Sequence, residues 1–118
     1  MGGKMIDGIG IDIVQIEKFR SLVNDEFVLR YFSETEKSLP IEKLAGKFAA
    51  KEALFKALDV QELFRWNDIE VISELNGSPK FNFNNHLAHY VQDKKIHLSI
   101  SHSNDNAIAF VIIENLIV

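Results

Sequence analysis

The sequence predicts an α+β fold in which a mainly antiparallel sheet packs against one long central helix. Residues 5–13 alternate as a strand does, residues 14–58 are mostly helical in pattern, and residues 68–114 are mostly strand-like. The regular alternation of strands and helices that a doubly wound parallel sheet needs is absent. At 118 residues, with 47% hydrophobic and 25% charged residues, the chain has the size and composition of one globular domain.

The individual elements follow from periodicity, propensity and turn residues. The strongest helix is expected at 42–58, which is rich in Ala, Leu, Lys and Glu, and Pro40 marks a break before it. Asn-Gly-Ser-Pro at 76–79 and Asn-Asp-Asn at 104–106 are turn sequences. The other expected elements are helices at 14–23 and 85–92, shorter helical pieces up to residue 37, and strands at 68–74, 80–83, 95–101 and 107–114.

Composition excludes several classes of protein. The chain has no cysteine, so disulfides, iron–sulfur clusters and thiolate zinc sites are excluded, and a reducing cytoplasm is the simplest location. Its 13 basic and 17 acidic residues give a net charge of −4, which disfavours nonspecific binding to nucleic acid. No apolar run is long enough for a transmembrane helix, so we expect no membrane partner.

The segment Gly-Ile-Gly-Ile-Asp-Ile at 8–13 is the first candidate for function. Alternation places Gly8, Gly10 and Asp12 on one bare face of the strand and the isoleucines on the other face, which we expect to be a packing surface. Glycine inside a strand often marks close approach by another backbone or a ligand. Asp12 then either caps the following helix or is a functional carboxylate. The third glycine of a dinucleotide fingerprint is missing.

The expected long helix carries the second candidate. Glu52 and Lys56 lie one turn apart in a gap between a bulky stripe and a stripe of small residues. An exposed ion pair is the simplest interpretation. The apolar flanks instead favour a partly buried site, in which a carboxylate can bind Mg²⁺ or take a proton and a lysine can bind phosphate. The small residues are Ala45, Gly46, Ala49, Ala50, Ala53 and Ala57.

The third candidate is His-Leu-Ser-Ile-Ser-His-Ser at 97–103. A catalytic triad of Ser101, His102 and Asp105 is disfavoured, because adjacent strand residues face opposite sides and no oxyanion-hole motif is visible. A zinc site from the four histidines is disfavoured too, because no acidic ligand has matching spacing. We expect Ser101, His102 and Ser103 to be polar groups at a loop mouth, able to hydrogen-bond an anionic ligand.

Three segments together resemble holo-[acyl-carrier-protein] synthase, the small bacterial type of 4′-phosphopantetheinyl transferase. They are Met-Ile-Asp-Gly-Ile-Gly-Ile-Asp-Ile at 5–13, Ala-Gly-Lys-Phe-Ala-Ala-Lys-Glu-Ala-Leu-Phe-Lys-Ala-Leu at 45–58, and His-Leu-Ser-Ile-Ser-His at 97–102. Shorter segments between them match in kind and order. The resemblance begins at Met5, so residues 1–4 are expected to be an N-terminal extension and residues 5–118 a single transferase domain.

The resemblance implies Mg²⁺-dependent transfer of 4′-phosphopantetheine from coenzyme A to a serine of apo-acyl carrier protein, a step in fatty acid biosynthesis that releases adenosine 3′,5′-bisphosphate. The family residues that match Asp12 and Glu52 bind Mg²⁺, and the one that matches Lys56 lies at the phosphates. Those that match His102 and Ser103 hold the nucleotide end of coenzyme A. Glu52, or a water that it orients, is the candidate base. The family is typically a homotrimer with coenzyme A between subunits.

The chain departs from the family pattern after Leu58. A glycine-rich loop, whose amides would approach phosphate, is replaced by Asp-Val-Gln-Glu-Leu-Phe-Arg-Trp at 59–66. Lys56, His102 and Arg65 are the cations that could compensate. This departure leaves open a second hypothesis, a coenzyme A- or nucleotide-binding module without transferase activity. A purely structural oligomerisation domain is a third hypothesis, based on the glycine and alanine packing faces.

The first helix is the expected docking surface, because the family's acidic carrier protein docks there. Lys18 and Arg20 could pair with carrier carboxylates, and Phe19 or Leu22 could serve as an apolar anchor. A solvated helix face is the alternative interpretation of the two cations.

Overall fold

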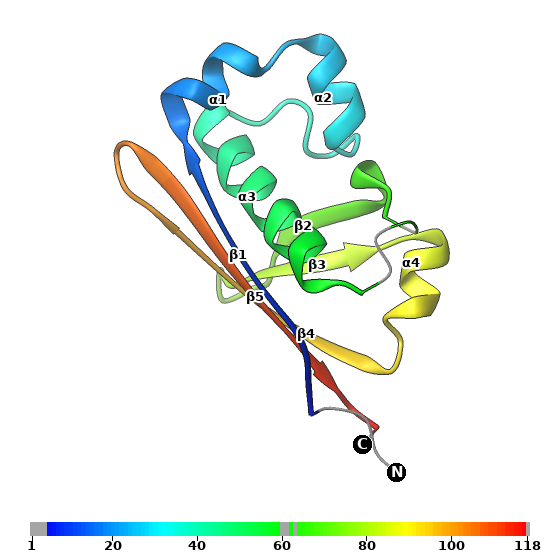
Figure 1. Ribbon diagram of the computed structural model, residues 1–118. Coiled ribbons are helices and arrows are strands. Elements are labelled where there is room, and N and C mark those ends of the chain that lie inside the picture. Colours follow the sequence, from blue (N-terminus) through cyan, green and yellow to red (C-terminus); the bar gives the residue numbers. More distant parts are fainter. Residues whose placement is uncertain (1–4, 60–61, 63, 118) are drawn as a thin grey trace.

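A computed structural model describes residues 5–59, 62 and 64–117. A three-stranded sheet in the order β1-β5-β4 lies against α3, and a separate β2-β3 hairpin covers another side of that helix (Figure 1). The helices and strands are β1 (Ile6–Gln15), α1 (Ile16–Leu22), α2 (Asp25–Tyr31), α3 (Ile41–Ala57), η2 (Trp66–Asp68), β2 (Ile69–Ser73), β3 (Pro79–Phe83), α4 (Asn85–Tyr90), β4 (Lys94–His102) and β5 (Asn106–Asn115). The expected extension at 1–4 lies outside the described residues.

The α+β prediction is confirmed, and all strand pairs are antiparallel, although the strands divide into two sheets. One shift of a boundary bears on the site: the first helix begins at Ile16 because β1 stays paired with β5 as far as Gln15 opposite Asn106. Asp12 therefore lies inside a strand, and the interpretation of Asp12 as a helix cap is wrong. No helix in the described part of the chain is long and apolar enough to cross a membrane.

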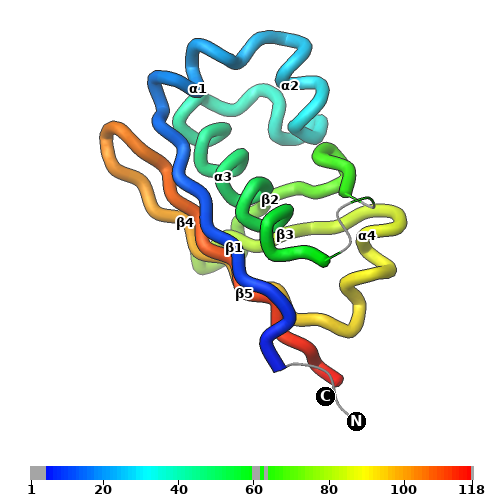
Figure 2. Tube along the Cα trace, viewed as in Figure 1, coloured from blue at the N-terminus to red at the C-terminus, as the bar shows by residue number. Residues whose placement is uncertain are grey.

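Close contact between β1 and α3 explains the glycines of the first strand. A Cβ atom at Gly8 would lie 1.9 Å from the backbone oxygen of Ala57, and one at Gly10 would lie 1.8 Å from that of Ala53. The small-residue stripe of α3 is buried. The helix runs along β1 and β5 (Figure 2) and packs on both strands. Because neither contact surface carries bulky side chains, the two backbones meet directly.

The two faces of β1 compare differently with the sequence-based expectation. The glycine face, which is bare of side chains, is approached closely by the backbone of α3, as glycines inside a strand indicated. The isoleucine face, expected to be a packing surface, is exposed within one chain. Ile9, Ile11 and Ile13 are 59%, 57% and 61% exposed, and Ile108 and Phe110 of β5 lie opposite Ile13 and Ile11. We call these five residues the outer apolar face.

We expect Gly10→Ala to lower the free energy of unfolding by about 1–3 kcal/mol, as overpacking of a tight core does. The added methyl group meets backbone rather than a movable side chain, so β1 must move away from α3. Urea unfolding measures the loss. Gly46→Ala is the matched control, because its methyl group would meet the movable end of the His102 side chain at 2.6 Å, and alanine is favoured over glycine in a helix. Wild-type stability of Gly10→Ala would show that the close approach is not needed.

Candidate active site

Asp12, Glu52 and Lys56 come together where β1 runs along α3. The Lys56 ammonium donates to Asp12 Oδ1 at 3.0 Å and to the backbone oxygen of Ile11 at 3.0 Å. The Asp12 side chain is 16% exposed and that of Lys56 51%, so the pair lies at the edge of the interior. The glycine contacts bring the strand close enough for this cross-element pair. Lys56 thus pairs with Asp12 on β1. The simplest interpretation of the sequence had paired it with Glu52 on its own helix.

Negative charge is in excess at this site. Burial raises the pKa of the Glu52 carboxyl, the charge of Asp12 raises it further, and the Lys56 ammonium acts in the opposite direction. One ammonium cannot neutralise two carboxylates that repel each other. A hard divalent cation held by one or two carboxylates, with water and substrate phosphate as its other ligands, is the usual arrangement of Mg²⁺. The donor set therefore fits Mg²⁺.

The same donor set does not fit a closed zinc site. Structural zinc needs four protein ligands, and catalytic zinc usually has three. Within residues 5–59, 62 and 64–117, no three His, Cys, Asp or Glu residues are grouped so that they could hold a metal ion. A metal held by Asp12 and Glu52 would therefore keep open coordination positions for water and substrate.

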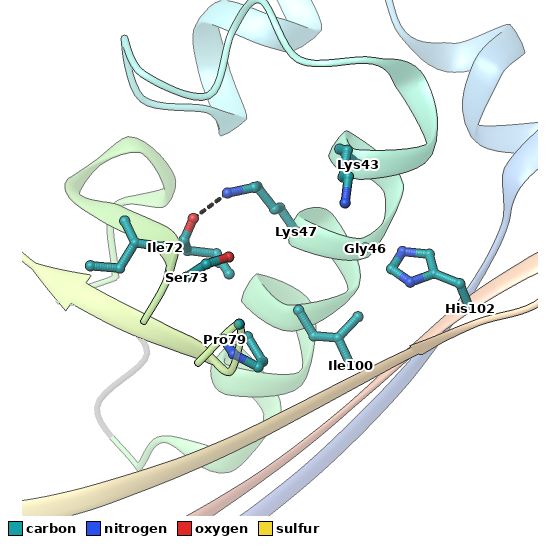
Figure 3. A pocket seen from close by; sticks show the side chains of 10 residues that line it. Lys43, Gly46, Lys47, Ile72, Ser73, Pro79, Ile100 and His102 are labelled. Atoms are coloured by element: carbon teal, nitrogen blue, oxygen red, sulfur yellow. Dashed lines mark hydrogen bonds between the residues drawn. The ribbon is translucent and has the colours of Figure 1, made fainter. Parts of the chain in front are cut away.

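A pocket of about 180 Å³ lies on a different side of α3 (Figure 3). Its basic side chains are Lys43 and Lys47 of α3 and His102 at the end of β4. His102 reaches this place because Gly46 has no side chain: a Cβ atom there would lie 2.6 Å from the imidazole Nε2. Its remaining lining residues are Gly46, Val71, Ile72, Ser73, Gly77, Pro79 and Ile100. We call this cavity the cationic pocket.

Lys47 has an unusual environment in the cationic pocket. Its ammonium donates to the backbone oxygen of Val71, and burial lowers its pKa while Glu36 and Glu70 raise it. Sequence reasoning missed Lys43 and Lys47 as binding residues. The two lysines are one helical turn apart, which is a visible signal, but the opposite walls come from β2 and β4, far away in the chain.

Ser103 lies beside His102 but is engaged in shaping the hairpin turn. Its hydroxyl oxygen accepts from the backbone nitrogens of Asp105 at 3.2 Å and Asn106 at 3.0 Å. Ser103 also lines a cleft that shares Lys43 and His102 with the cationic pocket. The loop-mouth position predicted for His102 and Ser103 is therefore observed, and their contact with a ligand stays a prediction.

Helix α1 offers only part of the predicted docking surface. Phe19 is 2% exposed and packs against the rings of Phe27, Phe32 and Phe48, so its assignment as an apolar anchor for a partner is wrong. Leu22 is 62% exposed and is accessible.

The two cations of α1 differ in their surroundings. Lys18 is exposed. Arg20 lies 3.4 Å from Glu17 and 3.5 Å from Glu42, so its charge is already partly neutralised by two surface carboxylates. Lys18 and Leu22 are therefore the more accessible of the predicted docking residues.

A carboxylate pair with a lysine, together with a lysine-lined pocket on another side of the same helix, indicates a class of protein suited to phosphorylated substrates. The family model of the 4′-phosphopantetheinyl transferase superfamily matches residues 8–111. The chain therefore belongs to this superfamily, which confirms the resemblance found in its motifs.

Individual relatives agree with this assignment. The holo-[acyl-carrier-protein] synthase of Leifsonia xyli is 42% identical over 115 residues, covering 93% of this chain and 98% of that protein. A holo-(acyl-carrier-protein) synthase from Bacillus anthracis, solved in complex with CoA (3′,5′-ADP), has a TM-score of 0.79 and 35% identity and covers 95% and 99% of the two chains. The enzyme from Neisseria meningitidis has a TM-score of 0.86 and 29% identity, with 94% and 100% covered.

Proposed function

We propose that this chain transfers 4′-phosphopantetheine from coenzyme A to a serine of an apo-acyl carrier protein in the cytoplasm and releases adenosine 3′,5′-bisphosphate. The observation that carries the proposal is the meeting of Asp12, Glu52 and Lys56 between β1 and α3, in a chain of the transferase superfamily. Relatives over nearly the whole length are holo-[acyl-carrier-protein] synthases, and one is solved with coenzyme A.

Asp12 and Glu52 would hold Mg²⁺, which when bound polarises the reacting phosphorus and neutralises phosphate charge. The Lys56 ammonium lies against Asp12, so it is placed to move from that carboxylate to the leaving phosphate. Glu52 takes the proton of the carrier serine, either directly or through a water that it orients.

The cationic pocket would take the nucleotide end of coenzyme A. Lys43 and Lys47 supply charge for its phosphates and the His102 imidazole offers a hydrogen bond, while Pro79 and Ile100 give an apolar surface for the base. These cations would replace the amides of the missing glycine-rich loop. Arg65 contributes less than expected, because its guanidinium donates to the backbone oxygens of Glu62 and Phe64 at 3.4 and 3.2 Å. Part of that loop, residues 60, 61 and 63, lies outside the described residues.

One experiment separates the candidate functions. The chain is mixed with apo-carrier protein, coenzyme A and Mg²⁺, and the carrier is weighed by mass spectrometry. A gain of one phosphopantetheine group supports the transferase. Coenzyme A binding without transfer supports the binding module suggested by the missing glycine-rich loop. If the chain neither binds coenzyme A nor transfers phosphopantetheine, the result supports a purely structural domain.

The outer apolar face supports a homotrimeric assembly with coenzyme A in clefts between subunits, as the family resemblance implies. Monomeric proteins seldom expose a contiguous row of large apolar side chains. Five such residues on adjacent strands, three of them more than half exposed, form a surface that a second copy of the chain can cover. The cationic pocket is open along one side, so a neighbouring subunit could complete it.

We expect Ile11→Glu to convert the assembly to monomers, because a carboxylate on the outer apolar face would be buried without a partner. Sedimentation or light scattering would show the mass of one chain. Leu75→Glu is the matched control, since Leu75 is fully exposed on the β2–β3 turn and should leave the mass unchanged. A wild-type chain that is a fully active monomer would contradict the assembly.

We expect Lys18→Glu to raise the KM for the carrier protein about tenfold, since it reverses one charge on an exposed face that should meet an acidic partner. The KM for coenzyme A should stay at its wild-type value. Steady-state kinetics with each substrate varied in turn measures both. Lys80→Glu, an exposed reversal on β3, controls for net charge. Equal changes in both KM values would assign Lys18 to an ordinary solvated face.

A further inference from the structure

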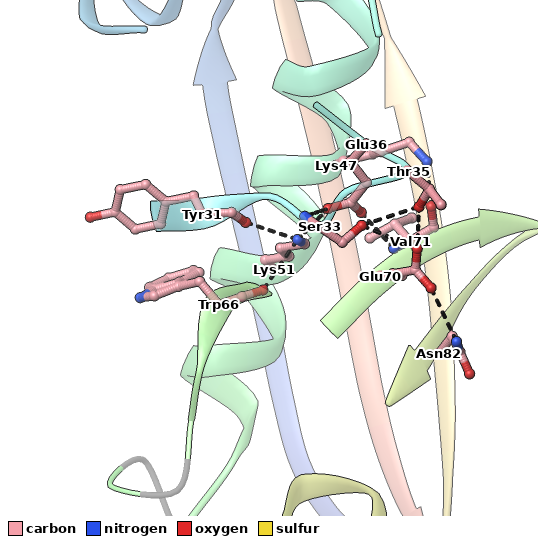
Figure 4. Close-up of polar contacts among 10 residues, drawn as sticks. All are labelled: Tyr31, Ser33, Thr35, Glu36, Lys47, Lys51, Trp66, Glu70, Val71 and Asn82. Carbon is pink, nitrogen blue, oxygen red and sulfur yellow. Dashed lines mark hydrogen bonds and ion pairs between the residues drawn. The ribbon is translucent and has the colours of Figure 1, made fainter. Parts of the chain in front are cut away.

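A buried ion pair lies between α3 and the loop that precedes it (Figure 4). The side chains of Lys51 and Glu36 are 0% and 1% exposed, and Lys51 Nζ lies 2.5 Å from Glu36 Oε1. The same ammonium donates to the backbone oxygens of Tyr31 at 2.9 Å and Trp66 at 3.2 Å. Its three N–H groups are thus all engaged, and the pair joins α2, α3 and η2.

Glu36 also binds the free edge of β2. Its Oε1 accepts from the backbone nitrogen of Ser33 at 2.9 Å, and its Oε2 accepts from that of Val71 at 2.8 Å. In the described sheets β2 pairs only with β3, so the other edge of β2 has no strand beside it. The backbone oxygen of Val71 accepts from Lys47. The backbone N–H and C=O groups of Val71 are therefore both bonded by side chains, the N–H by Glu36 and the C=O by Lys47.

The hydrogen bonds around the ion pair extend to residues that line the cationic pocket, but the two charged residues do not line it themselves. Val71 and Lys47 both line that pocket, whereas Glu36 and Lys51 do not. Lys51 is one turn beyond Lys47 on the same side of α3. The ion pair therefore sets the separation between α3 and β2, which are two walls of the pocket. Asp12 and Lys56 meet on another side of the helix and make no contact with the pair.

We propose that Glu36 and Lys51 are positioning residues that hold Lys47 and the Val71 edge of β2 as one wall of the cationic pocket, and so set the affinity for coenzyme A. The proposal rests on the proposed function, because it takes this pocket as the site of the nucleotide end. It assigns a function to two residues that touch neither the substrate nor the reacting groups.

The test uses Glu36→Gln and Glu36→Asp in the full chain. Glutamine keeps the shape but removes the charge that Lys51 binds, and aspartate keeps the charge but shortens the reach to Val71. Each variant should raise both the dissociation constant of coenzyme A, measured by calorimetry, and its KM about tenfold. The turnover number and the carrier KM should keep their wild-type values. Glu34→Gln is the control, because Glu34 belongs to the same loop but pairs with Lys37 on the surface.

Lys47→Met separates failure of this inference from failure of the pocket assignment. If Lys47→Met binds coenzyme A as tightly as wild type, the pocket is not the coenzyme A site, and the positioning role falls with it. If Lys47→Met weakens binding but the folded Glu36 variants bind normally, the ion pair is only structural and the inference is overturned. If a Glu36 variant loses thermal stability but keeps the wild-type KM for coenzyme A, the inference is likewise overturned. If one Glu36 variant fails to fold, the other decides.

Discussion

Asp12→Asn and Glu52→Gln should each lower kcat/KM for phosphopantetheine transfer by about 10²–10³-fold, the usual cost of removing one group that stabilises charge in the transition state. Each change keeps the shape of the side chain but removes a charged oxygen ligand from the site proposed for Mg²⁺. Both variants should stay folded, because neither carboxylate is fully buried. The gain in carrier mass with time measures the rate, and circular dichroism measures the fold.

Glu34→Gln is a matched control for these two variants. Glu34 is also a carboxylate bound to a lysine, with 2.6 Å between its Oε1 and Lys37 Nζ. It is exposed and belongs to the loop between α2 and α3. It should retain full activity. A chelator should abolish transfer by the wild-type chain, and added Mg²⁺ should restore it. Wild-type rates in either Asp12→Asn or Glu52→Gln would remove the metal-site hypothesis.

The sequence predicted the helices and strands well, but it did not predict which of their faces are buried. Alternation along β1 predicted the strand and placed Gly8, Gly10 and Asp12 on one face. Which face is buried depends on α3, because only the absence of side chains lets that helix meet the strand backbone. The same local pattern is compatible with either face being covered. The isoleucines therefore looked like core residues, although one chain leaves them exposed.

The candidate site shows the same division between local and long-range information. Family motifs identified Asp12, Glu52, Lys56 and His102, and helical spacing placed Glu52 and Lys56 in one gap. The bond from Lys56 to Asp12 joins residues 44 positions apart, and no periodicity predicts it. Phe19 shows the opposite error, because an apolar residue on a short helix can be either an anchor or a core residue. Only its packing against three other rings decides.

Lys51→Met should lower the free energy of unfolding by about 3–5 kcal/mol, because it leaves the Glu36 carboxylate buried without its counter-charge. The unbranched apolar side chain fills most of the space of the lysine stem, so the loss reports charge more than volume. Urea unfolding at neutral pH measures it. Lys37→Met is the matched control: it also breaks a lysine–glutamate pair, but an exposed one, which is worth about 0–1 kcal/mol.

A double-mutant cycle shows whether the loss belongs to the pair. Glu36→Leu alone leaves a buried ammonium with only the backbone oxygens of Tyr31 and Trp66 as partners. The double variant Glu36→Leu with Lys51→Met buries no isolated charge, so it should lose less stability than the sum of the two single variants. It still leaves the backbone nitrogens of Ser33 and Val71 without their acceptor, so it should not regain wild-type stability. Strict additivity would mean that the two charges are not coupled. That result would contradict both the large loss expected for Lys51→Met and the role of the pair in fixing the wall of the cationic pocket.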